Sequence, residues 1–209
     1  MTLSCILLAL ILDAFFGEPN WLWSKLQHPA VTFGKIITWG EKKYNNGINR
    51  KGKGVIFLSV IVIFLATVGY IIEQLPFSAI WKILIVAILL SHKSLIEHVS
   101  AVSLGLQKDI DHGRKAVAMI VGRDTATLNE SNVARSAIES AAENFSDGII
   151  APLFWFFIGG LPGIIVYKFV NTADSMIGYK HPQLEQFGWA SAKLDDILNW
   201  IPARLSGLL

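Results

Sequence analysis

The fold is decided by the apolar stretch IIAPLFWFFIGGLPGIIVYKFV, residues 149–170. It has about the length of the roughly 20 residues that a helix needs to cross a bilayer. However, the cluster Gly159-Gly-Leu-Pro-Gly163 lies in its middle, and glycine and proline at that density break a helix. The remaining halves, 150–158 and 164–170, are each too short to span alone. We therefore expect a re-entrant hairpin that returns to its own side, with its broken backbone shielded by other helices.

The alternative is one kinked helix that spans the membrane, because glycine and proline are also common in membrane helices. The two arrangements differ in where they put the polar segments on either side of the stretch. A hairpin brings both segments to one face, whereas a spanning helix separates them into two compartments. The sequence leaves both arrangements open.

The composition of the whole chain is that of an integral membrane protein. Of its 209 residues, 53% are hydrophobic and only 16% are charged, against about a quarter charged in a typical soluble domain. Further apolar segments lie at roughly 3–16, 54–72 and 77–91. Because only 73–76 separates the last two, they should form a tight antiparallel hairpin. The net charge of +2 is too small to indicate nucleic acid as a partner, and the single Cys5 can form no intrachain disulfide.

Basic residues predict the orientation. They are concentrated in segment 17–53, which contains two acids and these cations: Lys25, Lys35, Lys42, Lys43, Arg50, Lys51 and Lys53. The connection 73–76 has no Lys or Arg. By the positive-inside rule, 17–53 is cytoplasmic, 73–76 lies outside, and 92–148 is cytoplasmic again. The expected location is the cell (inner, cytoplasmic) membrane, with several passes and with the active face toward the cytoplasm.

The predicted fold class is an all-α, polytopic integral membrane protein with a helical cytoplasmic loop domain. Residues 1–91 form an N-terminal membrane region, 92–148 the cytoplasmic helical segment, and 149–209 a broken membrane segment with polar motifs. The first membrane helix should end at Gly17-Glu18-Pro19. An apolar run begins again at Ser206-Gly-Leu-Leu, so we expect a truncated chain that lacks a further membrane helix.

The cytoplasmic segment should contain its own helices. We expect them at about 93–107, 112–121 and 131–146. Asn129 or Ser131 can cap the last of them. Gly122 is interpreted as the residue that ends the preceding helix.

Carboxylates follow one stripe of the predicted helix 131–146. Arg135, Glu139 and Glu143 are spaced i, i+4, i+8, and Asp147 follows just beyond. Such a pattern is often a solvated face with an Arg135–Glu139 ion pair. However, two acids at i, i+4 repel each other unless a cation lies between them. The alternative is therefore a carboxylate pair that holds Mg²⁺, an ion that needs few protein ligands when substrate phosphates supply the rest.

Further polar residues lie close to the apolar stretch or in the loops. Arg123 could bind a phosphate or a carboxylate with two hydrogen bonds, or pair with Asp124 in a turn. Asp174 lies at the expected edge of the hydrocarbon, where a charge is costly, and it is either functional or a helix cap. The adjacent Asp195 and Asp196 point about 100° apart on a helix, so they should not share one ion. Asp196 shares a face with Asn199 instead.

Two residues near the N-terminus are weaker candidates. Asp13 either caps a helix or faces water, and a lone histidine such as His28 is more often packed than catalytic. The chain contains no known phosphate loop, no spaced Cys/His metal box and no Gly-x-Ser-x-Gly motif.

Taken together, the motifs resemble the adenosylcobinamide-phosphate synthase (CbiB/CobD) family of cobalamin biosynthesis. The resemblance covers nearly the whole chain, and it rests on the number and order of the motifs. They are Asp13 with Gly17-Glu-Pro, His28-Pro29 with Gly34, Val121-Gly-Arg-Asp-Thr, Glu139-Ser with Ala142-Glu-Asn and Asp147-Gly, Ala151-Pro-Leu-Phe-Trp, Gly160 with Pro162-Gly, Asn171-Thr-Ala-Asp-Ser with Ile177-Gly-Tyr, Phe187-Gly, Leu194-Asp-Asp and Pro202-Ala-Arg-Leu.

The resemblance implies a membrane-bound ligase. It would use ATP and Mg²⁺ to form an amide between adenosylcobyric acid, a corrinoid, and an aminopropanol-type aminoalcohol or its phosphate. Other implied partners are the lipid bilayer and other membrane enzymes of the corrinoid pathway. Family members are longer, with further apolar segments after Pro202-Ala-Arg-Leu.

The resemblance also assigns roles to residues. Glu139, Glu143 and Asp147 are expected to hold Mg²⁺–ATP, and with Asp174 and Asp195 they form the predicted catalytic set. Arg123 and Arg135 are expected to bind phosphate oxygens. The groups expected to orient the corrinoid carboxylate or the amine are Asn171, Asp174, Asp195 and Arg204, and the predicted substrate-binding set also includes Asn144 and His28.

Two other functions are compatible with the architecture. A non-enzymatic membrane regulator of the AmpE-like type should keep the apolar pattern and lose the clusters of acids and arginines, which are present here. A transporter should show paired, inverted broken segments, and the sequence shows one broken segment.

Overall fold

The computed structural model describes residues 2–17 and 19–209, so Glu18 of the Gly17-Glu18-Pro19 motif lies outside the described residues. The described residues form helices and loops with no strand. The helices are α1 (Thr2–Phe16), α2 (Asn20–Trp23), α3 (Pro29–Tyr44), α4 (Arg50–Gln74), α5 (Ser78–Leu89), α6 (His92–Lys108), α7 (Ile110–Val117), α8 (Glu130–Phe145), the π-helical turn η1 (Ser146–Ile150), α9 (Ala151–Ile177), α10 (Trp189–Asn199) and α11 (Pro202–Ser206).

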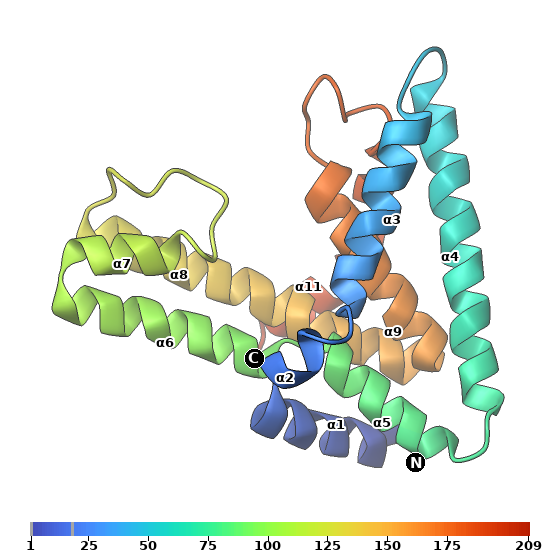
Figure 1. Cartoon of the computed structure of the whole chain (residues 1–209), viewed down its shortest axis with the longest axis horizontal. Coiled ribbons are helices and arrows are strands. Elements are labelled where there is room, and N and C mark those ends of the chain that lie inside the picture. Colours follow the sequence, from blue (N-terminus) through green and yellow to red (C-terminus); the bar gives the residue numbers. More distant parts are fainter. Residues whose placement is uncertain (1, 18) are drawn as a thin grey trace.

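Two bodies of helices are visible in Figure 1. In the first, α9 packs against α3, α4 and α10, and α5 packs against both α1 and α9. In the second, α6, α7 and α8 project to one side as an arm. The arm has a small hydrophobic core of its own, built on Val102, Val117, Val133 and Ala137. Residues 92–148 are thus largely helical, as their pattern predicts, whereas their separation as a cytoplasmic domain stays a prediction.

The helices of the arm begin close to the predicted positions. Asn129 caps α8 by accepting a hydrogen bond from the backbone N–H of Asn132 at 2.9 Å. The prediction that Gly122 ends the preceding helix is wrong, because α7 already ends at Val117 and Gly122 does not adopt a positive φ. The residues after Val117 leave the helix, and the Ile120 carbonyl accepts a hydrogen bond from the hydroxyl of Ser140 on α8 at 2.8 Å.

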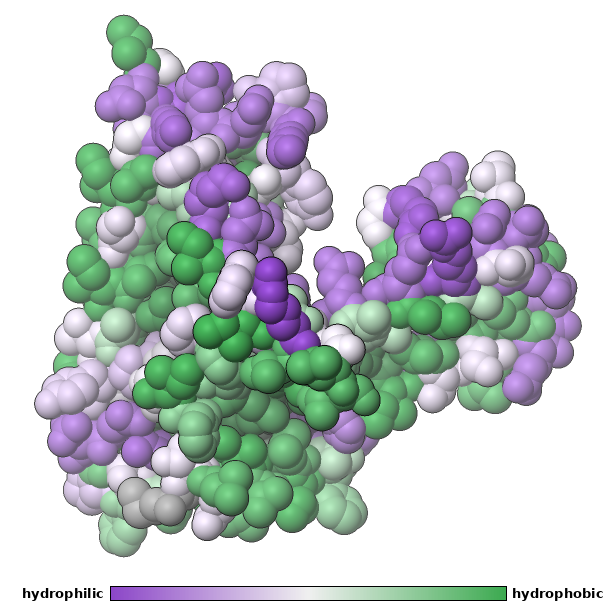
Figure 2. Space-filling view, turned by 180° about the vertical axis from the view of Figure 1, so that it is seen from behind, coloured by the Kyte–Doolittle hydropathy of each residue, from purple (hydrophilic) through white to green (hydrophobic). Residues whose placement is uncertain are grey.

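Three helical stretches of the described chain are long and apolar enough to cross a membrane. They are Arg50–Gln74, Ser78–Lys108 and Glu130–Ile177, and Thr2–Phe16 is a shorter apolar helix. Much of the surface of the first body is hydrophobic (Figure 2). An exposed apolar surface of this extent is typical of a protein that contacts lipid.

The expected antiparallel hairpin of 54–72 and 77–91 is not formed. From the turn that joins them, α4 and α5 diverge, because α5 runs along α1 and packs on α9 (Figure 1). The turn nevertheless has a structural role. The carboxylate of Glu73 accepts a hydrogen bond from the backbone N–H of Leu161 in α9 at 3.1 Å, and Lys82 Nζ lies 3.1 Å from the same carboxylate.

The helix α9 breaks at Gly160, where φ is 59° and ψ is −148°. This conformation is open only to glycine, and the break leaves the N–H of Leu161 without an acceptor in its own helix. Glu73 supplies that acceptor. At the same level α4 approaches very closely, since a Cβ added to Gly69 would lie 2.7 Å from the nitrogen of Pro162.

The break turns the segment back on itself. Asn171 Nδ2 donates a hydrogen bond to Asp147 Oδ2 at 3.1 Å, although the two residues are 24 apart in sequence. In a straight helix they would be about 36 Å apart, because each residue rises about 1.5 Å. The doubled-back geometry required by the hairpin prediction is therefore present, and the single kinked helix is not. That the hairpin enters a membrane from the cytoplasmic side stays a prediction.

We predict that Gly160→Ala destabilises the protein by about 1–3 kcal/mol, the usual cost of forcing a side chain into a disfavoured backbone conformation. The added Cβ would also collide with the carboxylate of Glu73. The measurement is the midpoint of thermal unfolding in detergent micelles. Gly159→Ala is the matched control, because a Cβ there meets nothing within 4 Å. Equal midpoints for the two variants would contradict this account of the break.

Candidate functional site

A polar cavity of about 470 Å³ lies where the arm meets the hairpin. Its walls come from the loop after α7, from one face of α8, from η1 and from the C-terminal half of α9. Six predicted site residues line it: Arg123, Glu139, Glu143, Asn144, Asp147 and Asn171. Because these residues come from segments far apart in sequence, the fold has brought the separate polar motifs together.

Small residues on α8 let the loop pack closely against it. The Ser140 hydroxyl donates to the Ile120 carbonyl, and Asn144 Nδ2 donates to the Ser140 carbonyl at 2.9 Å. Asn144 is therefore tied to its own helix. The contact with Ser140 holds the loop so that Arg123, three residues after Ile120, reaches across to Glu139.

Glu139 is the centre of an ion-pair cluster at the mouth of the cavity. Arg123 donates to its carboxylate at 2.7 Å and Arg135 at 2.9 Å. The Arg135–Glu139 pair that the spacing suggested is thus formed, whereas Arg123 pairs with Glu139 and not with Asp124. All three side chains are exposed, so the pairs contribute little to stability.

The three carboxylates expected to bind Mg²⁺ are not gathered as a ready metal cluster. Within residues 2–17 and 19–209, no three His, Cys, Asp or Glu side chains are close enough to hold an ion. Glu139 is occupied by its two arginines. Glu143 and Asp147 both line the cavity, and Glu143 forms no ion pair with any described residue. Two carboxylates with substrate phosphates are the ligand set that Mg²⁺ commonly uses.

Asp147 belongs to a half-buried hydrogen-bond network that joins η1, α9 and α10. Asn171 Nδ2 donates to Asp147 and lies 3.4 Å from Asp195 Oδ1. Asn199 Nδ2 donates to Asp195 Oδ2 at 3.0 Å, and the hydroxyl of Tyr167 donates to Asn199 Oδ1 at 3.0 Å. The two faces of the hairpin are therefore linked through polar groups. Asp147 lies in the π-helical turn, a kind of turn that often marks functional sites.

Sequence reasoning missed parts of this network. Tyr167 lies within an apolar run, and the only signal for it was that a buried tyrosine hydroxyl needs a partner. Asn199 was expected to face Asp196, but it bonds Asp195 one turn earlier. Asp196 points away and pairs with Lys193 at 3.0 Å. The prediction that Asp195 and Asp196 do not share an ion agrees with this divergence.

Burial, and after it the negative charge of Asp174, raises the pKa of the Asp195 carboxyl to about 6. Asp174 itself does not line the cavity, although its neighbour Ser175 does. Its backbone carbonyl accepts from the N–H of Gly178 at the end of α9. Asp174 therefore affects the network through its negative charge, which raises the pKa of Asp195.

The remaining candidates lie elsewhere. Arg204 is exposed, with its guanidinium 4.2 Å from the ring centroid of Trp200. The ring Nδ1 of His28 accepts from the N–H of Ala30 at 3.2 Å and so caps α3, and His28 lines a separate cavity of about 270 Å³. Asp13 is buried and accepts from the N–H groups of His92 and Lys93, which begin α6. The capping interpretation of Asp13 is therefore correct.

Fold and site together define an all-helical protein with apolar helices that suit a membrane and with a polar cavity that gathers charged and amide side chains. The family model described as "CobD/Cbib protein" matches residues 6–209. The chain belongs to the CobD/Cbib family. No solved structure was found to match it.

Several curated relatives are named "Cobalamin biosynthesis protein CobD". The one from Brucella anthropi is 51% identical over 97% of this chain and 65% of its own length. Those from Rhizobium meliloti and Halalkalibacterium halodurans are 47% and 41% identical, each over 98% of this chain and 65% of its own length. The chain thus spans 65% of the length of these relatives.

We predict that Asp195→Asn changes the pH dependence of stability. A raised pKa means that the contribution of Asp195 to stability is complete below its ordinary value of 3.8 and is lost as pH rises through about 6. Asparagine does not ionise but replaces one acceptor oxygen by a donor, so the variant loses one accepted hydrogen bond at every pH. The thermal unfolding midpoint of the variant minus that of the parent should therefore rise between about pH 4 and pH 7.

The matched control for this experiment is Asp196→Asn, because the Asp196 side chain is exposed and outside the network. Its margin over the parent should stay constant across the same range. Parallel curves for Asp195→Asn and the parent would show that Asp195 is not held beside Asp174 in a buried site.

Proposed function

We propose that this chain provides the site for ATP-dependent amide formation between adenosylcobyric acid and an aminopropanol-type aminoalcohol, or its phosphate, in cobalamin biosynthesis. Membership of the CobD/Cbib family and the names of the relatives support the pathway. The observation that carries the proposal is the polar cavity, in which Arg123 of the loop after α7 meets Glu143 and Asp147 of the continuous α8–η1 helix. An amide-forming enzyme that uses ATP needs such a convergence of cationic and anionic groups.

The cavity suits the phosphates of ATP and one Mg²⁺ ion. Glu143 and Asp147 would hold the ion, which would neutralise charge on the phosphates. Arg123 and Arg135 would bind phosphate oxygens. Both arginines are already held at the cavity mouth by Glu139. An entering phosphate would replace the Glu139 carboxylate as their partner, and the guanidinium groups would already be in place. Glu139 is thus a positioning residue for the arginines.

The proposed reaction has two displacements. An oxygen of the corrinoid carboxylate attacks the terminal phosphorus of ATP, and ADP leaves. The amine nitrogen then attacks the activated carbonyl carbon, phosphate leaves with the oxygen that had joined it to that carbon, and the nitrogen loses a proton. Phosphoryl transfer of this kind depends on positioning and charge stabilisation more than on a protein nucleophile. The absence of a serine or cysteine nucleophile motif from the sequence is consistent with it.

The Asp147–Asn171–Asp195 contacts would support this chemistry by fixing the floor of the cavity. Asn171 lies between two carboxylates and donates to them, so its amide oxygen remains available to a substrate amine or amide. A regulator without enzymatic activity would have no need of these aligned groups.

We predict that Glu143→Gln reduces turnover by about 100-fold or more, a loss typical of removing one preorganised electrostatic contact at a reacting phosphate. Because Glu143 is exposed, the fold should be unaffected. The measurement is adenosylcobinamide (phosphate) formation by the chain, extended with the C-terminal region of a longer relative, in a cobalamin-synthesising bacterium that lacks its own synthase and is fed adenosylcobyric acid.

The control is Glu130→Gln, an exposed acid in the first turn of α8 that does not line the cavity. It should retain full product formation, and both variants should reach the membrane at the level of the parent. Full turnover by Glu143→Gln would refute the assignment of this carboxylate, and no product from the extended parent would refute the proposed function.

A further inference from the structure

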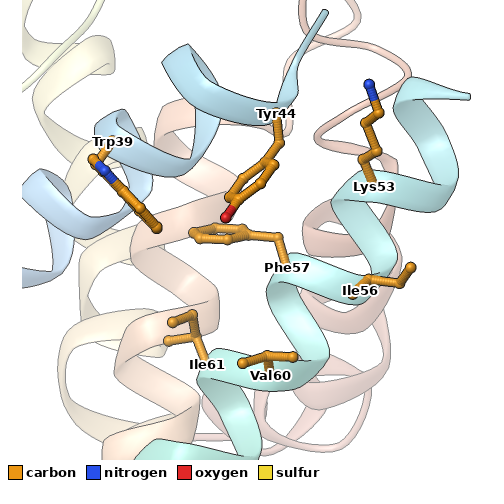
Figure 3. Close-up of a pocket in the computed structure, with 7 residues that line it drawn as sticks. All are labelled: Trp39, Tyr44, Lys53, Ile56, Phe57, Val60 and Ile61. Atoms are coloured by element: carbon orange, nitrogen blue, oxygen red, sulfur yellow. The ribbon is translucent and has the colours of Figure 1, made fainter. Parts of the chain in front are cut away.

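Another cavity, of about 400 Å³, lies between α3 and α4 and shares no lining residue with the polar cavity. Figure 3 shows its walls: Trp39 and Tyr44 come from α3, and Ile56 and Val60 come from α4. Lys53 stands at one end of the groove, above the apolar side chains (Figure 3). The groove is therefore apolar along its length and cationic at one end.

The floor of this groove is closely packed. Phe57 is buried, with its ring 6.2 Å from that of Tyr44 and 5.8 Å from that of Phe187. Its tip also fills the space next to Gly40 of α3, where an added Cβ would collide with the ring. The floor of the groove is thus part of the packing between α3 and α4.

The groove opens onto a surface that suits acyl chains. It lies near the start of α4, a helix long and apolar enough to cross a membrane. Outward-facing side chains of this helix remain exposed, and the exposed fraction is 66% for both Ile56 and Ile63. Figure 2 shows hydrophobic surface on this body beneath a hydrophilic end. Tyr44 ends α3 next to Lys42 and Lys43, and the ring centroid of Trp39 lies 5.7 Å from that of Tyr44. Aromatic rings beside basic residues are typical of the membrane–water interface.

Two cations are available at this interface. Lys53 Nζ donates to the carbonyl of Asn46 at 2.7 Å, which uses one of its three N–H groups. Lys43 Nζ lies 4.9 Å from the ring centroid of Trp39 and 5.5 Å from that of Tyr44, both of which line the groove. In the described part of the chain, neither lysine is ion-paired with an acid.

The two other basic residues in the first turn of α4 make contacts away from the groove. Arg50 bonds the side chain of Gln186, and Lys51 lies 3.6 Å from the ring centroid of Trp189. They raise the positive potential around the groove without occupying it. The combination of an apolar groove, aromatic walls and unpaired ammonium groups is complementary to a single amphipathic anion.

We propose that this groove binds one anionic glycerophospholipid. An acyl chain lies along Ile56, Val60 and Ile61 against the ring of Phe57, and the phosphate accepts hydrogen bonds from Lys43 and Lys53. Charge complementarity selects the lipid, because a basic juxtamembrane segment attracts anionic headgroups, whereas a zwitterionic headgroup brings a cation to the same site. The lipid joins α3 to α4, the two helices that hold α9 in place.

The test is native mass spectrometry of the full chain released from detergent micelles after titration with phosphatidylglycerol or phosphatidylcholine. Phosphatidylglycerol should bind more tightly, and the double variant Lys43→Gln/Lys53→Gln should weaken it by about 25-fold, or roughly fivefold for each lysine. Phosphatidylcholine binding should change little. Lys108→Gln/Lys115→Gln, on the arm and away from the groove, is the control with the same change in net charge.

A second pair of variants tests the groove itself and leaves the lysines intact. Val60→Trp fills part of the groove, whereas Val55→Trp makes the same substitution on an exposed face of the same helix outside the lining. Only Val60→Trp should lose phosphatidylglycerol. Equal affinity for the two lipids, equal effects of the two tryptophans, or a dimer that forms through this face in place of lipid binding would each overturn the proposal.

Discussion

The backbone N–H of Leu161 has no acceptor in its own helix, because the chain leaves the helical region at Gly160, and the carboxylate of Glu73 supplies the missing partner. An unsatisfied N–H in an apolar environment costs several kcal/mol, on the order of the penalty for burying any unpaired polar group. Lys82 balances the charge of the carboxylate. A single polar contact from the turn between α4 and α5 thus permits the break in α9 on which the rest of the structure depends.

The break in α9 determines which residues meet at the other end of the hairpin. Once α9 doubles back, Asn171 returns to Asp147, and α10 places Asp195 on the same amide. The arm completes the arrangement, because α8 runs directly into η1 and carries Glu143 to the cavity that Asp147 lines. The polar cavity is therefore a product of the fold of the whole chain. No one of its segments contains the site alone.

Much of this could be read from the sequence, and the limits have physical causes. The helices, the cap at Asn129 and the broken segment follow from local patterns of apolar residues, glycine and proline. The choice between a hairpin and a kinked span depends on Glu73, which is 88 residues from Leu161 and leaves no local signal. The role of Tyr167 could not be predicted, because this residue lies within an apolar run. The divergence of α4 from α5 depends on their packing against α9 and α1, which turn length alone does not determine. Most candidate residues near the hairpin came together, with Asp174 outside the cavity lining. His28 and Arg204 lie elsewhere, because each makes a capping or stacking contact with residues close to it in sequence.

The most direct test of the account is a short thiol cross-link between positions 147 and 171. With Cys5 replaced by alanine, the double variant Asp147→Cys/Asn171→Cys would be treated in the native membrane with a short bifunctional thiol reagent and its peptides analysed by mass spectrometry. We predict a cross-link between the two positions, because the ends of the native side chains are in hydrogen-bond contact and the reagent bridges the gap that the shorter cysteine side chains leave. No cross-link, together with labelling of the two cysteines from opposite sides of the membrane, would show that the segment spans and would contradict the account.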